Sequence, residues 1–454
     1  MRVKQEKSQA ELAFVGSDKV KPETQPDEGT ETLAAGSRPE SQAENERLME
    51  VMLERENLKQ ALRRVEENKG AAGVDGMRVK ELRAYLQQRW PELREQLQSG
   101  SYKPAPVRRV EIPKAGGGMR KLGIPTVVDR FIQQAILQIL QPDWDATFSR
   151  HSYGFRPCRT AHQAIAEAQE YINGGYDTVV DIDLEKFFDR VNHDVLMSRV
   201  ARRVADKRVL KLIRAYLNSG VLENGLVSAT DEGTPQGGPL SPLLSNLLLD
   251  EWDRELERRG HRFVRYADDC NIYVRSQRAG ERVLERMKYF LGRRLRLRVN
   301  EQKSAVGKPH ERKFLGYSFT SETPTRRRIA PQSVQRFKQR VRELTKRGQQ
   351  VKRVITELSR YLRGWVGYYG RTEWLGQLRE LDGWVRRRLR RYLWRAWQRP
   401  RRRYRILRRH GVPVRQAWRV VHFGPWRASR SQALCCVLAN AYFRALGLFS
   451  LARS

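Results

Sequence analysis

The chain has 454 residues, enough for two to four domains, and carries 88 Lys and Arg against 52 Asp and Glu, a formal net charge of +36. Such a charge indicates a polyanionic partner, with nucleic acid as the natural candidate. The chain has no run of about 18 apolar residues, no apolar signal region at its start and no CxxC spacing among its four cysteines, so we expect no membrane span, no secretion and no cysteine-based zinc module.

The N-terminal part divides into a polar leader and a first helix. Residues 1–43 are rich in Glu, Ser, Gln, Thr, Gly and Pro, and they are predicted to form a disordered leader. From residue 44 to residue 65 apolar side chains recur at steps of three and four, which predicts a helix that ends near Gly70.

A glycine-rich hairpin follows. Residues 108–113 have the pattern of a short strand, residues 114–120 contain three consecutive glycines, and residues 121–125 form the returning strand. The apolar segment 131–140 is predicted to be helical.

The middle of the chain alternates strands and helices. Residues 178–183 predict a buried strand that leads into a helix over 184–189, residues 262–275 predict a hairpin, and residues 313–319 predict another strand. Beyond about residue 331 the pattern is helical, and seven of the ten tryptophans lie there. The sequence therefore predicts a mixed α/β part followed by a mostly helical part.

Two groups of aspartates stand out in the mixed part. Asp268 and Asp269 lie at the polar tip of the predicted hairpin, and adjacent carboxylates repel unless a cation lies between them. Asp181 and Asp183 are two residues apart, so on a strand they share one face. A strand aspartate beside the hairpin pair would form a three-carboxylate site for two magnesium ions, which suits nucleotidyl transfer. The alternatives are an exposed turn for the pair, and a helix cap for either Asp181 or Asp183.

Tyr-Ala-Asp-Asp at residues 266–269 resembles the signature of reverse transcriptases, and the order of the surrounding motifs resembles the group II intron branch. The seven similar blocks are 103–125, 151–157, 183–193, 234–242, 266–269, 299–303 and 314–317. Residues 361–369 resemble the maturase domain (thumb, or domain X). The pattern is most similar to the compact class C enzymes without an endonuclease domain.

The resemblance implies an α+β right-hand polymerase, with fingers and an antiparallel palm sheet, followed by an α-helical thumb and a basic DNA-binding segment. The implied domains are a leader at 1–43, an N-terminal extension and fingers at 44–178, the palm at 179–322, the thumb at 323–396 and the basic segment at 397–454.

The resemblance also implies roles for individual residues. Asp183, Asp268 and Asp269 align with the catalytic aspartates, so Asp181 becomes an ordinary strand residue. These three carboxylates and the backbone of Leu184 would bind two Mg²⁺ ions, with Mn²⁺ as a substitute.

A second set of residues is implied to bind the incoming deoxynucleoside triphosphate (dNTP). The set is Lys114, Arg120, Phe188, Gln236, Gly237 and Lys303. Phe188 would exclude ribonucleotides by clashing with a 2′-hydroxyl, and two cations on a flexible turn would hold the triphosphate. Without the resemblance, Lys114 and Arg120 would lie at a solvated hairpin tip, and Phe188 would be a core aromatic like its neighbour Phe187. Gln236 and Gly237 would form a helix-entry turn, and Lys303 would be a surface lysine.

The C-terminal part carries most of the positive charge. From residue 326 to the end there are 34 Lys and Arg and 5 Asp and Glu, whereas the first 46 residues have a net charge of −4. Residues 384–397 interleave arginine with aromatic side chains, and the helical spacing of Leu389, Tyr392 and Leu393 predicts that these three pack in a core. The arginines are then the nucleic-acid contacts.

These features together predict an enzyme that copies intron RNA into DNA during retrohoming and assists splicing. The expected partners are intron RNA, an RNA template with a DNA or RNA primer, target DNA and dNTPs, in the bacterial cytoplasm at the nucleoid. With only Cys435 and Cys436 near its end, the chain is not expected to cleave target DNA. The alternatives are an RNA-binding splicing factor with little polymerase activity, and a related reverse transcriptase recruited to host defence.

Overall fold

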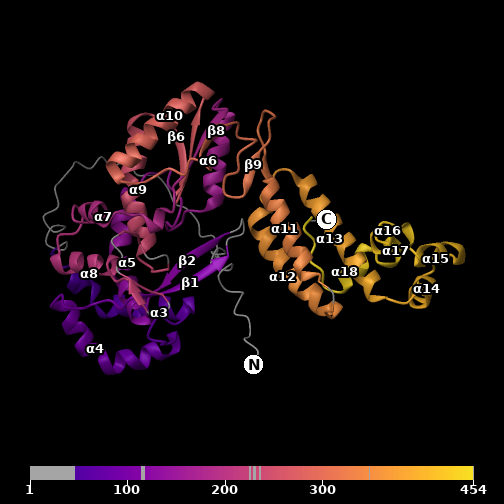
Figure 1. Ribbon diagram of the computed structural model, residues 1–454, viewed down its shortest axis with the longest axis horizontal. Helices are drawn as coiled ribbons and strands as arrows, with labels where there is room; N and C mark the ends of the chain where they lie inside the picture. Colours follow the sequence, from indigo (N-terminus) through magenta and orange to yellow (C-terminus); the bar gives the residue numbers. More distant parts are fainter. Residues whose placement is uncertain are drawn as a thin grey trace, which may run out of the picture. The chain divides into compact units, whose positions relative to one another are not determined.

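The computed structural model describes residues 46–113, 118–223, 226–228, 232–234, 237–346 and 348–452. They form two compact units, which divide between Leu315 and Gly316 and have separate hydrophobic cores (Figure 1). This division falls seven residues before the predicted end of the palm at residue 322. The predicted leader at 1–43 lies outside the described residues, and the predicted domain boundaries stay predictions.

The first unit is rich in helices. Its α-helices are α2 (Leu48–Met52), α3 (Arg55–Asn68), α4 (Leu82–Gln98), α5 (Val127–Thr147), α6 (Ala161–Asn173), α7 (His193–Val200), α8 (Lys207–Leu217), α9 (Ser241–Arg258) and α10 (Gln277–Phe290). Single turns of other helix types are η2 (Val79–Glu81), η3 (Phe187–Asp189) and η4 (Leu291–Leu295). The predicted first helix is divided into α2 and α3, and the segment predicted at 131–140 belongs to the longer α5, which the Thr126 side chain caps.

The predicted helix at 184–189 is wrong. Only the 3₁₀ turn η3 forms there, and Lys186 before it has a left-handed backbone with φ of 48°. Leu184 forms a bridge with Val299, and the Glu185 amide donates to the Arg298 carbonyl at 2.8 Å. These contacts extend the sheet ladder past the end of the strand, so tertiary pairing overrides the local helical pattern.

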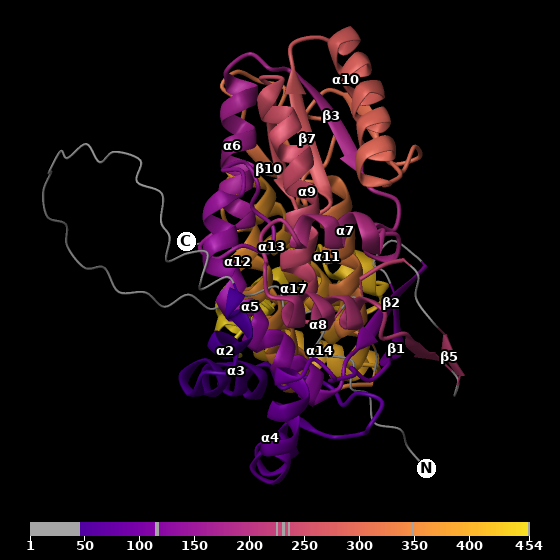
Figure 2. The ribbon, with the colours of Figure 1, turned by 90° about the vertical axis from the view of Figure 1, so that its left-hand side faces the viewer.

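A four-stranded antiparallel sheet lies in the first unit, as predicted for the palm. Its order is β6 (Arg262–Tyr266), β7 (Asp269–Val274), β3 (Thr178–Asp183) and β8 (Ala305–Gly307). Helix α10 runs beside β3 and β7 (Figure 2). A Cβ on Gly280 of α10 would lie 2.4 Å from a Val306 methyl and 3.3 Å from a Val180 methyl, so glycine lets the helix approach the sheet. Because side chains alternate along β3, Asp181 and Asp183 lie on the opposite face from Val180.

A second sheet contains the predicted glycine-rich hairpin. β1 (Val107–Pro113) pairs antiparallel with β2 (Met119–Ile124), which confirms the two predicted strands. The sheet continues from β1 to β4 (Val221–Glu223) and β5 (Leu226–Ser228), two short strands that the sequence pattern did not reveal. The tip of the hairpin at 114–117 lies outside the described residues.

The second unit begins with a hairpin and is otherwise helical. The hairpin pairs β9 (Tyr317–Phe319) with β10 (Arg327–Ile329), so the strand predicted at 313–319 is limited to its last three residues. The helices are α11 (Pro331–Leu344), α12 (Val351–Tyr369), α13 (Leu375–Ala396), α14 (Pro400–Arg409), α15 (Val414–Val421), α16 (Pro425–Ala428), α17 (Gln432–Val437) and α18 (Asn440–Ala445). Leu389, Tyr392 and Leu393 are buried in its core, as their spacing predicted.

Hydrogen bonds connect residues 447–451, near the end of the described chain, to two helices of this unit. Asp382 of α13 forms an ion pair with Arg386 and accepts hydrogen bonds from the Ser450 hydroxyl and the Leu451 amide. The Ser359 hydroxyl of α12 donates to the Gly447 carbonyl. Among the described residues, no helix combines the length and the apolar character that crossing a membrane would require.

Candidate active site

The palm sheet brings the predicted aspartates together at one end. Asp183, the last residue of β3, lies directly opposite Asp269, the first residue of β7. Tyr266 and Asp269 are the closing pair of the hairpin, so Ala267 and Asp268 form a two-residue turn. Ala267 has φ of +57°, which a turn this tight requires. The register thus places Asp183, rather than Asp181, across from the hairpin pair.

Burial and mutual repulsion make charge on the hairpin carboxylates unfavourable. Burial, followed by the nearby charges of Asp181, Asp268 and Asp183, raises the pKa of Asp269 well above its usual range. Burial also raises the pKa of Asp268, and the Asp183 carboxylate adds to this, while Arg120 and Lys303 oppose it. Each of these carboxylates would be stabilised by a nearby cation.

Asp183 is fixed by the block at 299–303 and the residue that follows it. The Asn300 amide donates to the Asp183 carbonyl at 2.8 Å, and the Ser304 hydroxyl accepts from the Asp183 amide at 2.9 Å. The Lys303 ammonium lies 3.2 Å from a carboxylate oxygen of Asp183. Lys303, which we predicted near the triphosphate, is therefore an immediate neighbour of a predicted catalytic carboxylate.

Asp181 has a different environment. Its carboxylate forms an ion pair with Arg312 at 2.7 Å. Burial raises the pKa of Asp181, and the Arg312 guanidinium opposes that shift. The alternative of a helix cap is wrong for both strand aspartates, because Lys186 and Asn192 precede the helical segments that follow.

A buried arginine, which the motif analysis missed, supports the catalytic turn. Arg265 of β6 and Asp253 of α9 form a fully buried ion pair, with nitrogen–oxygen distances of 2.7 and 2.5 Å. Arg265 also donates to the Ala267 carbonyl at 2.8 Å and to the Asn246 side chain at 3.2 Å. It therefore links α9 directly to the turn that carries Asp268. The sequence could have indicated this role, because Arg265 is two residues from Phe263 and so shares its strand face. A charge on a buried face needs a partner.

The block at 151–157 also contacts this turn, through its backbone. Ser152 bridges Arg265 as a short parallel pair, in which the Tyr153 amide donates to the Arg265 carbonyl at 2.9 Å. A Cβ on Gly154 would lie 2.2 Å from the Ala267 amide nitrogen, so only glycine fits there. This block therefore contributes backbone support to the catalytic hairpin.

The predicted nucleotide-binding residues are partly described. Phe188 is half-buried and packs edge-on against Phe187, which lies in the core as predicted. The Thr234 amide donates to the Phe188 carbonyl at 2.7 Å, so the block beginning at residue 234 lies beside this aromatic. Lys114 and Gln236 lie outside the described residues.

Gly237 and Arg120 connect this region to the second sheet. Gly237 has φ of +140°, and a Cβ there would lie 2.6 Å from the carbonyl oxygen of Gly123 in β2. Arg120, on the same strand, is exposed and close enough to Asp268 to lower its pKa. The hairpin of the second sheet therefore faces the catalytic end of the palm.

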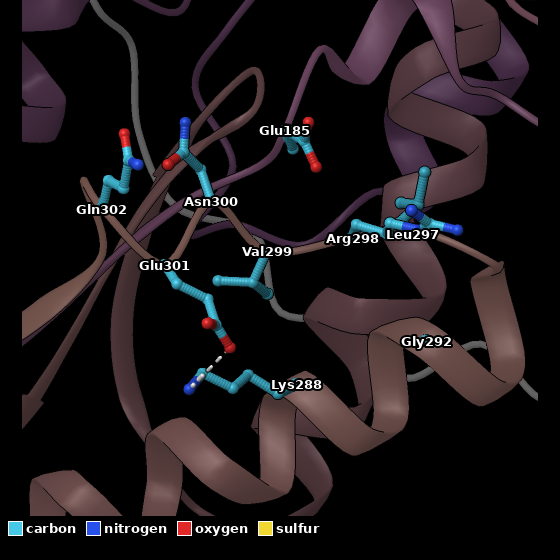
Figure 3. Close-up of a pocket in the computed structure, with 9 residues that line it drawn as sticks. All are labelled: Glu185, Lys288, Gly292, Leu297, Arg298, Val299, Asn300, Glu301 and Gln302. Atoms are coloured by element: carbon cyan, nitrogen blue, oxygen red, sulfur yellow. Dashed lines mark ion pairs between the residues drawn. The ribbon is translucent and has the colours of Figure 1, made fainter.

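A cavity of about 650 Å³ lies beside the 299–303 block (Figure 3). Its lining residues are Glu185, Lys288, Gly292, Leu297, Arg298, Val299, Asn300, Glu301 and Gln302. Lys288 and Glu301 form an ion pair across it at 3.5 Å. Because the three aspartates do not line this cavity, it is not the place of the predicted chemistry.

The donor set of the aspartates fits hard divalent cations, which prefer carboxylate and carbonyl oxygens. Neither Asp268 nor Asp269 forms an ion pair with a described side chain, and both have raised pKa values that a bound cation would lower. In this structure, no group of three or more His, Cys, Asp or Glu side chains among the described residues is arranged to hold a metal ion. The Asp183 carboxylate contacts the Lys303 ammonium, so a bound ion would compete with this lysine for the carboxylate.

Comparisons with known proteins identify both parts of the chain. Residues 112–319 match the family described as "Reverse transcriptase (RNA-dependent DNA polymerase)", and residues 334–411 match "Group II intron, maturase-specific domain".

The chain is also similar to individual proteins. Protein YkfC of Escherichia coli (strain K12) is 35% identical over 58% of this chain and 80% of its own length. The group II intron-encoded protein LtrA of Lactococcus lactis is 29% identical over 56% of this chain, which spans only 53% of LtrA. A solved partial Cas6-RT-Cas1--Cas2 complex contains a chain that is 26% identical, with a TM-score of 0.36, over 54% of this chain and 42% of that chain. With its three aspartates at one end of an antiparallel palm sheet, the chain belongs to the family of group II intron-encoded reverse transcriptases and maturases, which are RNA-directed DNA polymerases.

Proposed function

We propose that the chain copies the RNA of a group II intron into DNA and that its helical unit binds that RNA and assists splicing. The observation that carries the polymerase assignment is the register of the palm sheet, which sets Asp183 opposite Asp269 beside the turn residue Asp268. The match of residues 334–411 to a maturase-specific domain supports the splicing role.

Reverse transcriptases use divalent metal ions, and we propose Mg²⁺ as the natural ion here, with Mn²⁺ as a substitute. Asp183, Asp268, Asp269 and the Leu184 backbone carbonyl would hold two such ions. When bound, the ions supply Lewis-acid stabilisation of the attacking 3′-oxygen and of the leaving pyrophosphate. The Arg265–Asp253 pair and the block at 151–157 would keep the turn rigid, so that the carboxylates need little reorganisation.

The triphosphate would bind between the second sheet and the palm. Arg120 and Lys114 of the hairpin and Lys303 of the palm would contact phosphate oxygens by charge-assisted hydrogen bonds. Phe188 would lie under the incoming sugar, where a 2′-hydroxyl would clash with its ring. Gln236 and Gly237 would let the backbone approach the templating base pair.

The polyanionic partners would bind the basic unit. Reverse transcriptase and maturase relatives bind RNA, and we propose intron RNA, an RNA template with its DNA or RNA primer, and target DNA as the partners of this chain. Its 34 Lys and Arg against 5 Asp and Glu from residue 326 onward support this proposal. We also propose that the protein works in the bacterial cytoplasm at the nucleoid, where the intron RNA and target DNA meet.

Primer extension on an RNA template with dNTPs and Mg²⁺ tests the polymerase proposal. We expect extension by wild type and none by Asp268→Ala/Asp269→Ala, because the variant lacks two of the three carboxylates. RNA binding by the variant should stay close to wild type, since phosphate contacts lie elsewhere.

The second candidate is an RNA-binding splicing factor with little polymerase activity, which the maturase match favours. Wild type that folds, binds intron RNA and promotes splicing, yet never extends a primer, would establish that candidate and reject the polymerase. A reverse transcriptase used in host defence would instead lack intron RNA structure in its flanking DNA.

A further inference from the structure

A largely buried carboxylate in the first unit takes no part in the chemistry proposed above. Glu167 lies on α6, which packs against β6 of the palm sheet, and its side chain is 15% exposed. One carboxylate oxygen accepts hydrogen bonds from Nδ1 of His151 and from the Tyr171 hydroxyl. The other accepts from the Tyr153 hydroxyl at 2.7 Å. Burial works to raise the pKa of Glu167, but the three hydrogen bonds outweigh it and the pKa is lowered. A charged carboxylate is therefore held by three donors.

Arg150 determines which ring nitrogen of His151 carries the proton. Its Nε donates a hydrogen bond to Nε2 of the His151 ring at 3.2 Å. Because a neutral imidazole has one donor and one acceptor nitrogen, Nδ1 then carries the proton and donates it to Glu167. The same ring packs on Phe263 of β6, with ring centroids 5.1 Å apart. His151 is thus held between α6 and the palm sheet in one orientation.

The backbone of the same residues pairs with the strand that leads into the catalytic turn. The His151 carbonyl accepts from the Arg265 amide at 2.9 Å, and the Tyr153 amide donates to the Arg265 carbonyl at 2.9 Å. Two of the three donors to Glu167 therefore belong to residues that flank Arg265 in the sheet. Gly154 follows at once, and a Cβ there would lie 2.2 Å from the Ala267 amide nitrogen. A shift of residues 151–154 would therefore shift the turn.

We propose that Glu167 is a positioning residue for the polymerase. Through the side chains of His151 and Tyr153 it fixes the backbone of residues 151–154, and through that backbone it fixes the turn that carries Asp268. A displacement of about 1 Å at a reacting group can lower a rate by about 10²-fold, so an indirect hold of this kind is felt in the chemistry. The inference deepens the proposed function and rests on it for the reaction whose rate is measured.

Single-nucleotide incorporation on an RNA template with a DNA primer tests the effect on the reaction. We expect Glu167→Ala to lower kcat by about tenfold or more, because the turn loses its fixed place. The KM for dNTP should change little, since the proposed triphosphate contacts of Arg120 and Lys303 are untouched. A residue that served stability alone would not divide its effect in this way once the variant is folded.

A conservative variant and a control on the same helix accompany this measurement. Glu167→Gln should restore most of kcat, because its amide oxygen accepts from His151 and Tyr171, and its amide nitrogen donates to the Tyr153 hydroxyl. Glu170→Ala, at an exposed position of α6, should behave like wild type.

Amide hydrogen exchange measures the hold on the turn without any activity. Glu167→Ala should speed exchange of the Tyr153 and Arg265 amides, which donate the two bonds between the block and β6. Exchange of Val180 and Ile272, paired in the centre of the sheet, should stay close to wild type.

The outcomes separate this inference from the proposed polymerase. Wild-type kcat and wild-type exchange in a folded Glu167→Ala variant would overturn the positioning role, and so would a loss of kcat that Glu167→Gln does not restore. If Glu167→Ala does not fold, Tyr153→Phe/Tyr171→Phe removes two of the three donors, keeps both rings and should give the same pattern to a smaller extent. No extension by wild type would reject the polymerase, whereas faster exchange limited to these amides would still establish that Glu167 holds the turn.

Discussion

The position of Asp269 suits a charged metal ligand, but its surroundings disfavour the charged carboxylate. Its place at the start of β7 opposite Asp183 suits a cation ligand, but burial and three neighbouring carboxylates raise its pKa well above the usual range. A carboxyl group with a raised pKa in the folded state contributes stability at acid pH, and this contribution is lost as pH rises through that pKa. Without a cation, Asp269 therefore makes the palm less stable at neutral pH than at acid pH.

We expect Asp269→Asn to raise the melting temperature of the metal-free protein at pH 8 and to have little effect near pH 4, where the wild-type carboxyl is protonated. For a domain of this size, about 1 kcal/mol corresponds to roughly 2–4 °C. Melting in chelator at several pH values measures the difference, and Mg²⁺ at pH 8 should stabilise wild type more than the variant. The exposed Asp143→Asn is the control. A variant no more stable than wild type at pH 8 would show that a protein cation already neutralises Asp269.

Lys303 lies between a carboxylate and the proposed place of the triphosphate. Lys303→Gln should raise the KM for dNTP by roughly tenfold or more, the effect of losing one charge-assisted hydrogen bond. It should also lower the Mg²⁺ concentration needed for half-maximal activity, because the ammonium no longer pairs with Asp183. Lys288→Gln, in the neighbouring cavity, should change neither value. A lower Mg²⁺ requirement with an unchanged KM would restrict Lys303 to the pairing role.

Among the elements, the β6–β7 hairpin receives direct support from α9 and from the block at 151–157. Arg265 contacts Asp253, Asn246 and the Ala267 carbonyl while fully buried. Arg265→Lys keeps the charge but cannot reproduce the planar set of donors, so the turn should lose its fixed geometry. We expect kcat to fall by roughly tenfold or more, with a smaller change in the KM for dNTP.

The control for this change is Arg199→Lys, because Arg199 also forms an ion pair with α9, through Glu251, but this pair is partly exposed and lies away from the turn. Thermal melting accompanies the kinetics, since the change at Arg265 is expected to reduce stability by about 1–3 kcal/mol and the change at Arg199 by about 1 kcal/mol or less. A wild-type kcat in a destabilised but folded Arg265→Lys variant would show that Arg265 serves folding alone.

The catalytic hairpin and the β1–β2 hairpin could be predicted because apolar arms flank a short polar or glycine-rich tip in each. The register between β3 and β7 could not, because it is set by pairing between residues about 90 positions apart. The helix predicted at 184–189 failed for a related reason, since the bridge from Leu184 to Val299 is invisible locally. From the sequence, Arg265 stood out only as a charge within an apolar strand. Its partner on α9, Asp253, could be identified only from the fold.

At the scale of the whole molecule, charge is separated along the chain. The first 46 residues have a net charge of −4, whereas residues from 326 onward have a net charge of +29. Binding of nucleic acid should therefore release many counterions and weaken steeply with salt. We expect RNA affinity to fall by roughly 10³-fold or more between 50 and 200 mM salt.

Filter binding across that salt range measures the slope. Arg401→Gln/Arg402→Gln, two exposed arginines of α14, should make the slope shallower by about one unit for each phosphate that the variant no longer neutralises. Asp268→Ala should leave it unchanged. A flat salt response of the wild type would contradict the role given to the basic unit.

The order of strands in the palm has a consequence for synthesis of the protein. β3 is complete once residue 183 leaves the ribosome, but its neighbours β7 and β8 are at 269–274 and 305–307. Until both arrive, the strand carrying Asp183 exposes unpaired edges, which are prone to pair with other chains. A nascent chain halted in this interval would be inactive and aggregation-prone, so the polymerase becomes competent only after residue 307 has been translated.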